Sequence, residues 1–173
     1  MIKKMLMVNG TEVAVLASGD ETLANVLRGQ LGLTGTKIGC GEAQCGCCNV
    51  ILDNKLVRSC VTKMSKVANG ASVTTIEGVG TPNSMHPLQL AFIVHGAIQC
   101  GFCTPGFIVS AKALLDENPN ASEEEIKHAI AGNLCRCTGY VQIIDSIKSV
   151  SGFYQEEEKP AAAWDGHGGA LED

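Results

Sequence analysis

The segment that decides the fold is IGCGEAQCGCC, residues 38–48. It places Cys40, Cys45 and Cys48 in the pattern C-x4-C-x2-C, and Cys60 follows after eleven further residues. Three thiolates from one loop and a fourth from a neighbouring segment can converge on a small metal core, and this spacing is that of a plant-type [2Fe–2S] cluster. The interspersed glycines let the loop wrap closely and expose backbone N–H groups toward the sulfurs.

Two alternatives stay open for this loop. Structural zinc is also held tetrahedrally by four thiolates, although zinc sites favour tighter C-x2-C pairs and do not require glycines between them. Cys47 stands between Cys45 and Cys48 and could compete with Cys48 as a ligand. The C-x4-C-x2-C register favours Cys48, so we expect Cys47 to be a small buried thiol.

A second group follows the pattern C-x2-C, thirty-one residues, C-x-C, and consists of Cys100, Cys103, Cys135 and Cys137. This spacing alone fits zinc as well as an iron–sulfur cluster. Thr104-Pro105 follows Cys103, and proline is common at the first position of a helix. We therefore expect Cys100 and Cys103 at a helix N-terminus, where free N–H groups and the helix dipole favour thiolates.

The overall composition limits the classes of function. The 173 residues are 45% hydrophobic and 18% charged, which suits a folded core. A net charge of -5 and an aromatic content of 4% argue against a nucleic-acid partner. No apolar run is long enough for a membrane span, and residues 1–10 lack the features of a secretory signal. Nine cysteines, an odd number, then indicate metal or redox chemistry in the cytoplasm rather than a disulfide framework.

The order of the predicted elements indicates an α+β chain. Residues 4–8 and 12–17 flank Asn9-Gly10, a strong hairpin signal, and further strands are expected at 49–52, 55–58 and 72–76 with a helix at 22–31. After Gly78 four helices with short links are expected near 87–95, 105–117, 122–130 and 143–150. We therefore predict domains at residues 1–78 and 79–155, followed by a tail or linker at 156–173.

Three segments make the chain recognisable: IGCGEAQCGCC at 38–48, QCGFCTPG at 99–106 and NLCRCTGY at 133–140. In this order and register they resemble the iron–sulfur subunit of the xanthine oxidase family of molybdenum hydroxylases, over about residues 1–155. Segments such as RGQLGLTG, VILDNKLVRSCVTKM and VTTIEGVG make the chain look most like the iron–sulfur part of bacterial aldehyde oxidoreductases. The sequence departs from the family at Cys47, where a small residue such as alanine is common, and after about residue 155.

The resemblance implies two [2Fe–2S] clusters. Cys40, Cys45, Cys48 and Cys60 would hold one in an N-terminal ferredoxin-like β-grasp domain, and Cys100, Cys103, Cys135 and Cys137 would hold the other in a C-terminal four-helix bundle. Gln99 and Cys137 match positions that contact the pterin end of a molybdenum cofactor, the molybdopterin, which a large partner subunit would mainly hold. No catalytic residue or substrate site is expected in this chain.

The expected role is electron transfer. In the implied reaction a molybdenum centre in the partner inserts water-derived oxygen into a C–H bond, and this chain carries the two released electrons away one at a time. The acceptor would be an FAD-binding subunit or a flavodoxin- or ferredoxin-like carrier. Aldehydes are the first choice of substrate, with purines and aromatic N-heterocycles as alternatives. Two other classes compete: a free-standing ferredoxin carrier and a zinc-stabilised interaction module.

Other polar residues receive structural interpretations. His86, which precedes Pro87, and His95 are expected to cap or pack a helix. Arg136, between two cysteines, is expected either to offset cluster charge or to be a plain surface residue. The tail is expected to be a solvated linker, or alternatively an arm that docks Trp164 into a partner.

Overall fold

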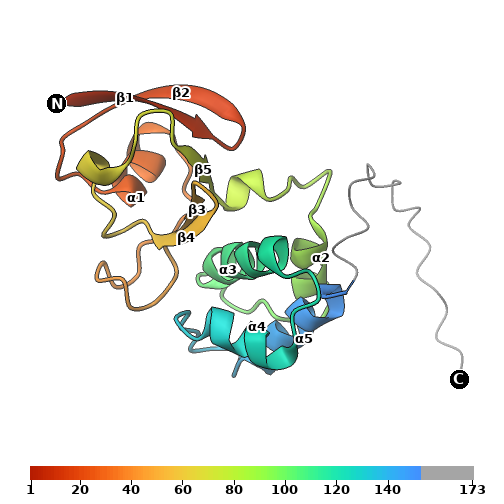
Figure 1. Ribbon diagram of the computed structural model, residues 1–173. Coiled ribbons are helices and arrows are strands. Elements are labelled where there is room, and N and C mark those ends of the chain that lie inside the picture. Colours follow the sequence, from red (N-terminus) through yellow and green to blue (C-terminus); the bar gives the residue numbers. More distant parts are fainter. Residues whose placement is uncertain (153–173) are drawn as a thin grey trace, which may run out of the picture.

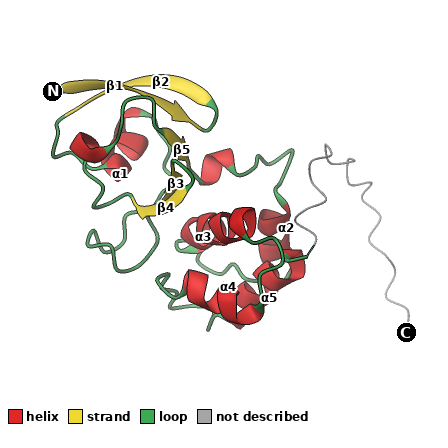
Figure 2. Ribbon diagram, viewed as in Figure 1, coloured by secondary structure: helices red, strands yellow, loops and turns green. Residues whose placement is uncertain are grey.

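The computed structural model describes residues 1–152, and the predicted tail at 156–173 with Trp164 lies outside them. Within this range the chain is α+β, as the sequence predicts: a sheet lies in one half and helices fill the other (Figures 1 and 2). The strands are β1 (Ile2–Val8), β2 (Thr11–Ala17), β3 (Asn49–Leu52), β4 (Lys55–Arg58) and β5 (Ser72–Thr74). The α-helices are α1 (Leu23–Asn25), α2 (Pro87–Val94), α3 (Thr104–Glu117), α4 (Glu123–Ile130) and α5 (Val141–Val150). We call residues 1–78 the sheet half and residues 79–152 the helical half.

The sheet is mixed, with the strand order β2-β1-β5-β3-β4. β1 runs parallel to β5, and the other neighbouring pairs are antiparallel. Two hairpins close through two-residue turns, Asn9-Gly10 and Asp53-Asn54, and all four turn residues have positive φ. This is the turn geometry that matches the twist of the flanking strands, so the hairpin predicted at Asn9-Gly10 is confirmed.

The helix predicted at 22–31 is only partly α-helical. Thr22 caps it through a hydrogen bond from the Asn25 N–H to Thr22 Oγ1 at 3.3 Å. After one turn the chain widens into a π-helical turn, Val26–Gln30, in which the Leu31 N–H donates to the Val26 carbonyl at 3.2 Å. The wider turn places the Gln30 amide against β2, where it exchanges two hydrogen bonds with the Leu16 backbone. Pairing with the sheet therefore replaces the regular helix that hydrophobic period alone predicts.

Two apolar cores meet at β3. The core of the sheet half includes Leu6, Leu23, Leu27, Val50, Met64 and Val73, and the core of the helical half includes Leu88, Phe92, Phe107, Leu115, Ile126, Ile143 and Ile147. Successive strand residues point to opposite faces, so Val50 enters the first core while Ile51 enters the second. α3 packs on β3 and thereby connects the halves (Figure 1).

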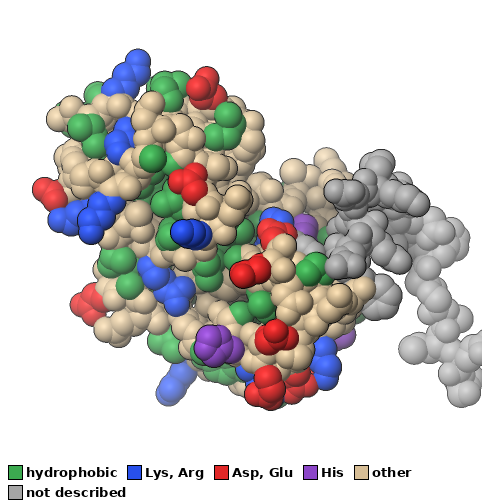
Figure 3. Space-filling view, in the orientation of Figure 1, with side chains coloured by type: hydrophobic (Ala, Val, Ile, Leu, Met, Phe, Trp, Pro, Cys, Tyr) green, Lys and Arg blue, Asp and Glu red, His purple; other side chains and the backbone are tan. Residues whose placement is uncertain are grey.

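Two helices of the helical half, α2 and α4, begin at side-chain caps. His86 caps α2, where the Leu88 N–H donates to His86 Nδ1 at 3.2 Å, as the sequence predicts. The capping box of Ser122 and Glu125 at the start of α4 is also confirmed. Glu123 binds both Lys127 of α4 and Lys148 of α5, at 2.8 Å and 2.7 Å. Acidic side chains gather over α4 in Figure 3, and the first turn of α4 carries Glu123, Glu124 and Glu125.

None of the helices between residues 1 and 152 combines the length and the apolar character that a membrane crossing needs.

Candidate metal centres

The first thiol group lies on the loop that precedes β3 and at the end of the β3–β4 hairpin. Cys40, Cys45 and Cys48 come from the loop, and Cys60 follows β4 two residues after its end. The loop turns through Gly41 and Gly46, which have φ values of 73° and 70°, and through Ala43 at 64°. An alanine in this region is strained, so the surrounding contacts must hold the loop in this path.

Backbone N–H groups of this loop point at sulfur. The N–H groups of Glu42 and Gln44 donate to Cys40 Sγ, both at 3.3 Å, and the Cys40 N–H donates to Cys45 Sγ at 3.4 Å. Hydrogen bonds from the backbone of Glu42, Cys45 and Gln44 lower the pKa of Cys40 from 9.0 to about 7. The sequence-based expectation that loop N–H groups face the sulfurs is confirmed, and the loop favours thiolates or an anionic cluster.

The other end of the first group is buried. Cys48 and Cys60 are 1% and 8% exposed, whereas Cys40 lies at the surface. Burial, together with the neighbouring Cys60 thiol, raises the pKa of the Cys48 thiol to about 11. The Ser59 hydroxyl donates to the Cys48 carbonyl at 2.6 Å and holds the two cysteine-bearing segments together. The site therefore has one edge at the surface and one edge inside the molecule.

Cys47 is the small buried thiol that the sequence predicts, with 5% exposure. Its thiol points to the Cys45 carbonyl, 3.8 Å away, and burial raises its pKa to about 12. Such a group is a protonated S–H donor rather than a thiolate. The choice of Cys48 over Cys47 as a ligand stays a prediction.

The second thiol group is assembled from two loops of the helical half. Cys100 lies on the loop after α2, and Cys103 is the N-cap of α3, as the sequence predicts. Cys135 and Cys137 lie on the loop between α4 and α5, and Cys137 Sγ is 3.7 Å from Cys100 Sγ. Cys100 and Cys137 are exposed, while Cys103 and Cys135 are half-buried.

The two half-buried thiols of this group have opposite pKa shifts. Burial and the adjacent Cys135 raise the pKa of Cys103 to about 12. Burial also acts on Cys135, but hydrogen bonds from the Thr138 hydroxyl and backbone outweigh it and lower the Cys135 pKa. Thr138 Oγ1 donates to Cys135 Sγ at 3.2 Å.

Tyr140 is a supporting residue that the sequence analysis missed. The Cys135 N–H donates to Tyr140 Oη at 3.0 Å, and Tyr140 Oη in turn donates to the Asn133 carbonyl at 3.3 Å. Its ring meets Phe107 edge to face at 6.0 Å, and its backbone has a φ of 73°. The position of Tyr140 at the end of the NLCRCTGY segment, three residues after Cys137, was the available signal, because a tyrosine hydroxyl beside ligand cysteines can hydrogen-bond to their backbone.

Two further predicted site residues lie at the surface. Gln99, next to Cys100, and Arg136, between Cys135 and Cys137, are both exposed. They share this surface with the exposed apolar side chains of Ile98, Phe102, Leu134 and Val141, which are 40–61% accessible. The second thiol group therefore opens onto a largely apolar face.

The two thiol groups are in direct contact through backbone. The Leu134 N–H donates to the Cys45 carbonyl at 2.9 Å, which connects a cysteine of the first group to the neighbour of Cys135. Gly106, in the first turn of α3, lies so close to Gly46 and Cys47 that a Cβ there would overlap their backbone. No motif in the sequence predicts this contact between the halves.

The sulfur arrangement fits a two-iron cluster at each group. Cys40 contacts Cys45 and Cys48 contacts Cys60, while Cys100 pairs with Cys137 and Cys103 with Cys135. Two pairs of thiols are what two bridged iron ions require. A zinc ion would need four sulfurs at about 2.3 Å from one point, whereas these thiols lie in pairs such as Cys100 and Cys137.

Comparison with known proteins gives the same assignment. Residues 6–71 match the model of a 2Fe-2S iron-sulfur cluster binding domain, and residues 75–148 match that of a [2Fe-2S] binding domain. The aldehyde oxidoreductase of Megalodesulfovibrio gigas is 55% identical over 152 residues, which are 85% of this chain and 16% of that protein. The small subunit of nicotine 6-hydroxylase from Paenarthrobacter nicotinovorans is 44% identical, over 84% of this chain and 87% of that one. The crystal structure of the aldehyde oxidoreductase from Desulfovibrio desulfuricans superimposes with a TM-score of 0.88 and 54% identity, over 91% of this chain and 18% of that one.

Proposed function

The chain belongs to the iron–sulfur small subunits of the xanthine oxidase family of molybdenum hydroxylases, and we propose that it conducts electrons from a molybdenum centre in a large partner subunit to an acceptor. It spans only 16% of the length of the M. gigas aldehyde oxidoreductase, so the substrate-oxidising part of the complex lies outside these 173 residues. A [2Fe–2S] cluster held by four thiolates supplies one-electron transfer when bound and leaves no open position for substrate.

The observation that carries this proposal is the hydrogen bond from the Leu134 N–H to the Cys45 carbonyl, 2.9 Å long. It joins the backbone of one proposed ligand, Cys45, to the residue beside another, Cys135. The two groups are thus connected by covalent bonds and one short hydrogen bond, without a gap that an electron would have to cross through space. A structural metal site has no need of such a link.

The proposed ligands follow from the paired thiols. We assign Cys40, Cys45, Cys48 and Cys60 to the first cluster and Cys100, Cys103, Cys135 and Cys137 to the second. The domains are residues 1–78, a ferredoxin-like β-grasp domain, and residues 79–155, a four-helix bundle. The family matches at 6–71 and 75–148 and the two separate cores support this division.

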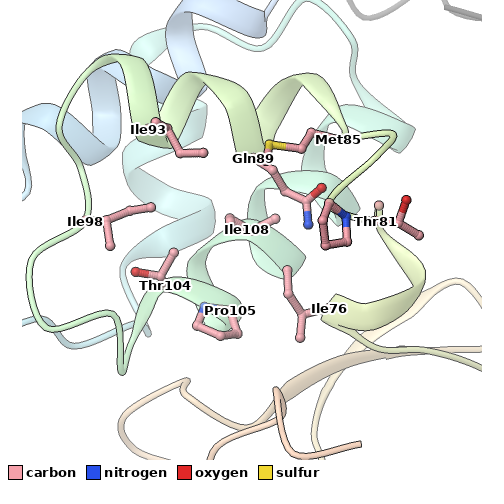
Figure 4. A pocket seen from close by; sticks show the side chains of 11 residues that line it. Ile76, Thr81, Met85, Gln89, Ile93, Ile98, Thr104, Pro105 and Ile108 are labelled. Carbon is pink, nitrogen blue, oxygen red and sulfur yellow. The ribbon is translucent and has the colours of Figure 1, made fainter.

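The entry side for electrons is the face around Cys100 and Cys137. Both thiols are exposed there, Gln99 lies beside them, and we assign Gln99 and Cys137 to contacts with the molybdopterin of the partner. An apolar groove of about 290 Å³ continues this face, lined by Ile93, Ile98 and Ile108 among others (Figure 4). An exposed apolar surface of this kind supports burial against a protein partner.

The exit side is the surface edge of the first group. Cys40, Glu42 and Gln44 are exposed there, on the loop that precedes β3. An FAD-binding subunit or a flavodoxin- or ferredoxin-like carrier would approach this edge. We also place the protein in the cytoplasm, which the unpaired state of all nine cysteines supports.

Metal analysis and EPR of the purified chain with its native partners test the proposal. We expect four iron ions and no zinc per chain, two distinct EPR signals after reduction, and co-purification of a large molybdenum-containing chain. Cys137→Ser should remove one signal and Cys60→Ser the other. A colourless protein, stoichiometric zinc, or loss of both signals from either single substitution would contradict the assignment.

Aldehydes are the proposed substrates of the complex, because the M. gigas enzyme is named an aldehyde oxidoreductase and is 55% identical. Aromatic N-heterocycles are the second candidate, because the relative of similar length belongs to a nicotine hydroxylase. Dye reduction by the native complex with a panel of aldehydes, purines and nicotinate-type compounds separates these choices. Turnover of only N-heterocycles would reject the aldehyde assignment and leave the electron-transfer role intact.

A further inference from the structure

We propose that Arg58 is a positioning residue that clamps the two thiol groups together and holds a fixed positive charge between them. This inference rests on the proposed function, because it concerns how two [2Fe–2S] clusters are coupled. Arg58 lies at the end of β4, two residues before Cys60, and is half-buried. No sequence motif singles out Arg58.

The guanidinium of Arg58 reaches three separate segments. Its Nε donates to the Ala43 carbonyl at 3.2 Å, on the loop between Cys40 and Cys45. Its Nη1 donates to Asn49 Oδ1, beside Cys48. Its Nη2 donates to the Gly132 carbonyl at 2.9 Å, on the loop that carries the second thiol group. One side chain therefore ties the backbone around the first group to the loop of the second.

A buried network continues from Arg58 into α3. Asn49 Nδ2 donates to Ser110 Oγ at 2.7 Å, and the Ser110 hydroxyl lies within hydrogen-bond distance of two acceptors, the Gly106 carbonyl at 2.8 Å and Asn133 Oδ1 at 3.1 Å. Asn133 Nδ2 then donates to the Gly46 carbonyl at 3.3 Å, which returns the network to the first loop. Asn49, Ser110 and Asn133 are at most 2% exposed. Fully satisfied buried networks fix one geometry, because each broken bond leaves an unpaired polar group.

Two glycines show how tightly this junction is packed. A Cβ on Gly132 would overlap Arg58 Nη2, and a Cβ on Gly46 would lie 2.7 Å from Asn133 Nδ2. A side chain at Gly132 would displace the Arg58 guanidinium, and one at Gly46 would also meet the Gly132 carbonyl oxygen at 2.8 Å. The close approach makes the separation of the two thiol groups depend directly on Arg58 and Asn133.

The charge of Arg58 is not neutralised locally. Within residues 1–152 its hydrogen-bond partners are the Ala43 and Gly132 carbonyls and Asn49 Oδ1. Arg58 forms no salt bridge with a carboxylate of these residues. A guanidinium remains charged at all physiological pH values. Because reduction adds negative charge to each cluster, this cation favours the reduced forms and raises their potentials.

Low-temperature EPR and redox titration of the purified full chain with its clusters test the clamp. In the fully reduced protein the two paramagnetic centres split each other's signals, and this splitting falls with the cube of their distance. We expect Asn133→Ala to reduce the splitting while leaving both midpoint potentials near those of the wild type, because it loosens the junction without removing the charge. Arg58→Met should reduce the splitting and also make reduction of the first cluster about tenfold less favourable, a shift of ~59 mV to more negative potential.

Two further variants complete the experiment: Arg58→Lys, which keeps the charge, and Arg28→Met, which is a control. Lysine keeps the charge but cannot bind three segments. In Arg58→Lys the midpoint potential of the first cluster should therefore lie near that of the wild type, while the splitting of the EPR signals falls. Arg28 is the matched control: its Nη1 donates to the Thr34 and Thr36 carbonyls, all within the sheet half, and its loss should leave splitting and potentials unchanged. If Arg58→Met does not retain iron, Arg58→Lys and Asn133→Ala decide the question by the splitting alone.

Unchanged splitting in both Arg58→Lys and Asn133→Ala would overturn the clamp. A shift of similar size in Arg28→Met would also overturn it, because any lost arginine would then have the same effect. Failure of the proposed function has a different signature: the wild-type chain itself would lack two EPR signals. Two wild-type signals with unaffected variants would reject the clamp and keep the electron-transfer role.

Discussion

Replacing Gly106 with alanine adds one carbon atom, the Cβ, at the contact between the two halves and thereby tests that contact. Gly106 is the third residue of α3, three residues after Cys103, and packs on the backbone of Gly46 and Cys47. An added Cβ would lie 3.0 Å from Cys47 Cα and 3.1 Å from the Gly46 carbonyl carbon, and closer still to the Gly46 oxygen, whereas ordinary contacts begin at 3.4 Å. These are backbone atoms, so the substitution must push the start of α3 away from the first thiol loop.

The expected cost follows from overpacking, which typically destabilises by about 1–3 kcal/mol. Alanine gains up to about 1 kcal/mol over glycine inside a helix, but less in the first turn, where hydrogen bonding is incomplete. The net loss should be about 1–2 kcal/mol, which for a chain of this length lowers Tm by about 2–8 °C.

The assay is thermal unfolding followed by circular dichroism, together with the rate at which visible cluster absorption bleaches, because cluster loss makes unfolding irreversible. Gly29→Ala is the matched control: an added Cβ there meets nothing within 4 Å. It should leave Tm unchanged or slightly raised. A Gly106→Ala protein as stable as the wild type, with equal bleaching rates, would refute the close approach of α3 to the first loop.

Three further predictions concern single side chains. Burial and the nearby Lys112 lower the pKa of His86 from 6.5 to about 4. Between pH 6.5 and pH 4, His86 therefore binds a proton in the unfolded chain but not in the folded chain. The stability of the wild-type protein should therefore fall as pH drops from 6.5 toward 4. The His86→Asn variant, which keeps a capping acceptor, should lose less stability over this range. Equal slopes of Tm against pH in the two proteins would contradict the burial of His86. Cys47→Ala should retain four iron ions and both EPR signals, and loss of one cluster would instead make Cys47 a ligand. Ser122→Ala should cost about 1 kcal/mol and lower Tm by about 2–4 °C, and an unchanged Tm would show that the α4 cap contributes nothing.

Local signals in the sequence predicted the elements well. Asn9-Gly10 predicted the first hairpin, the Ser122–Glu125 box predicted the start of α4, and Pro105 predicted the helix that begins beside Cys103. Each of these depends on contacts between residues a few positions apart, which a sequence displays directly. The π-helical turn at Val26–Gln30 was missed, because it depends on Gln30 pairing with Leu16 of a separate strand.

The cysteine pattern predicted two thiol groups but not their contact. The spacing C-x4-C-x2-C describes one loop, and C-x2-C with C-x-C describes two more, without information on how these loops meet. The Cys45–Leu134 hydrogen bond spans 89 positions, and the Arg58–Gly132 bond spans 74. Arg58, Asn133 and Tyr140 were therefore overlooked, although each lies within five residues of a cysteine.

The polar junction between two apolar cores has a physical reason in the loops themselves. Thiol ligands must converge from turns, so irregular backbone with unpaired carbonyls is brought into the interior where the two groups approach each other. Buried carbonyls need donors, and the backbone supplies only some of them at this place, such as the Asn49 N–H to the Gly46 carbonyl and the Leu134 N–H to the Cys45 carbonyl. Arg58 supplies donors to Ala43 and Gly132, and Asn133 supplies one to Gly46. Apolar side chains of similar size would pack as well but would remove the Arg58 donors to the half-buried Ala43 and Gly132 carbonyls, and an unsatisfied buried acceptor costs about 1–3 kcal/mol. The short distance between the thiol groups and the polarity of their junction are thus two consequences of the same buried loops.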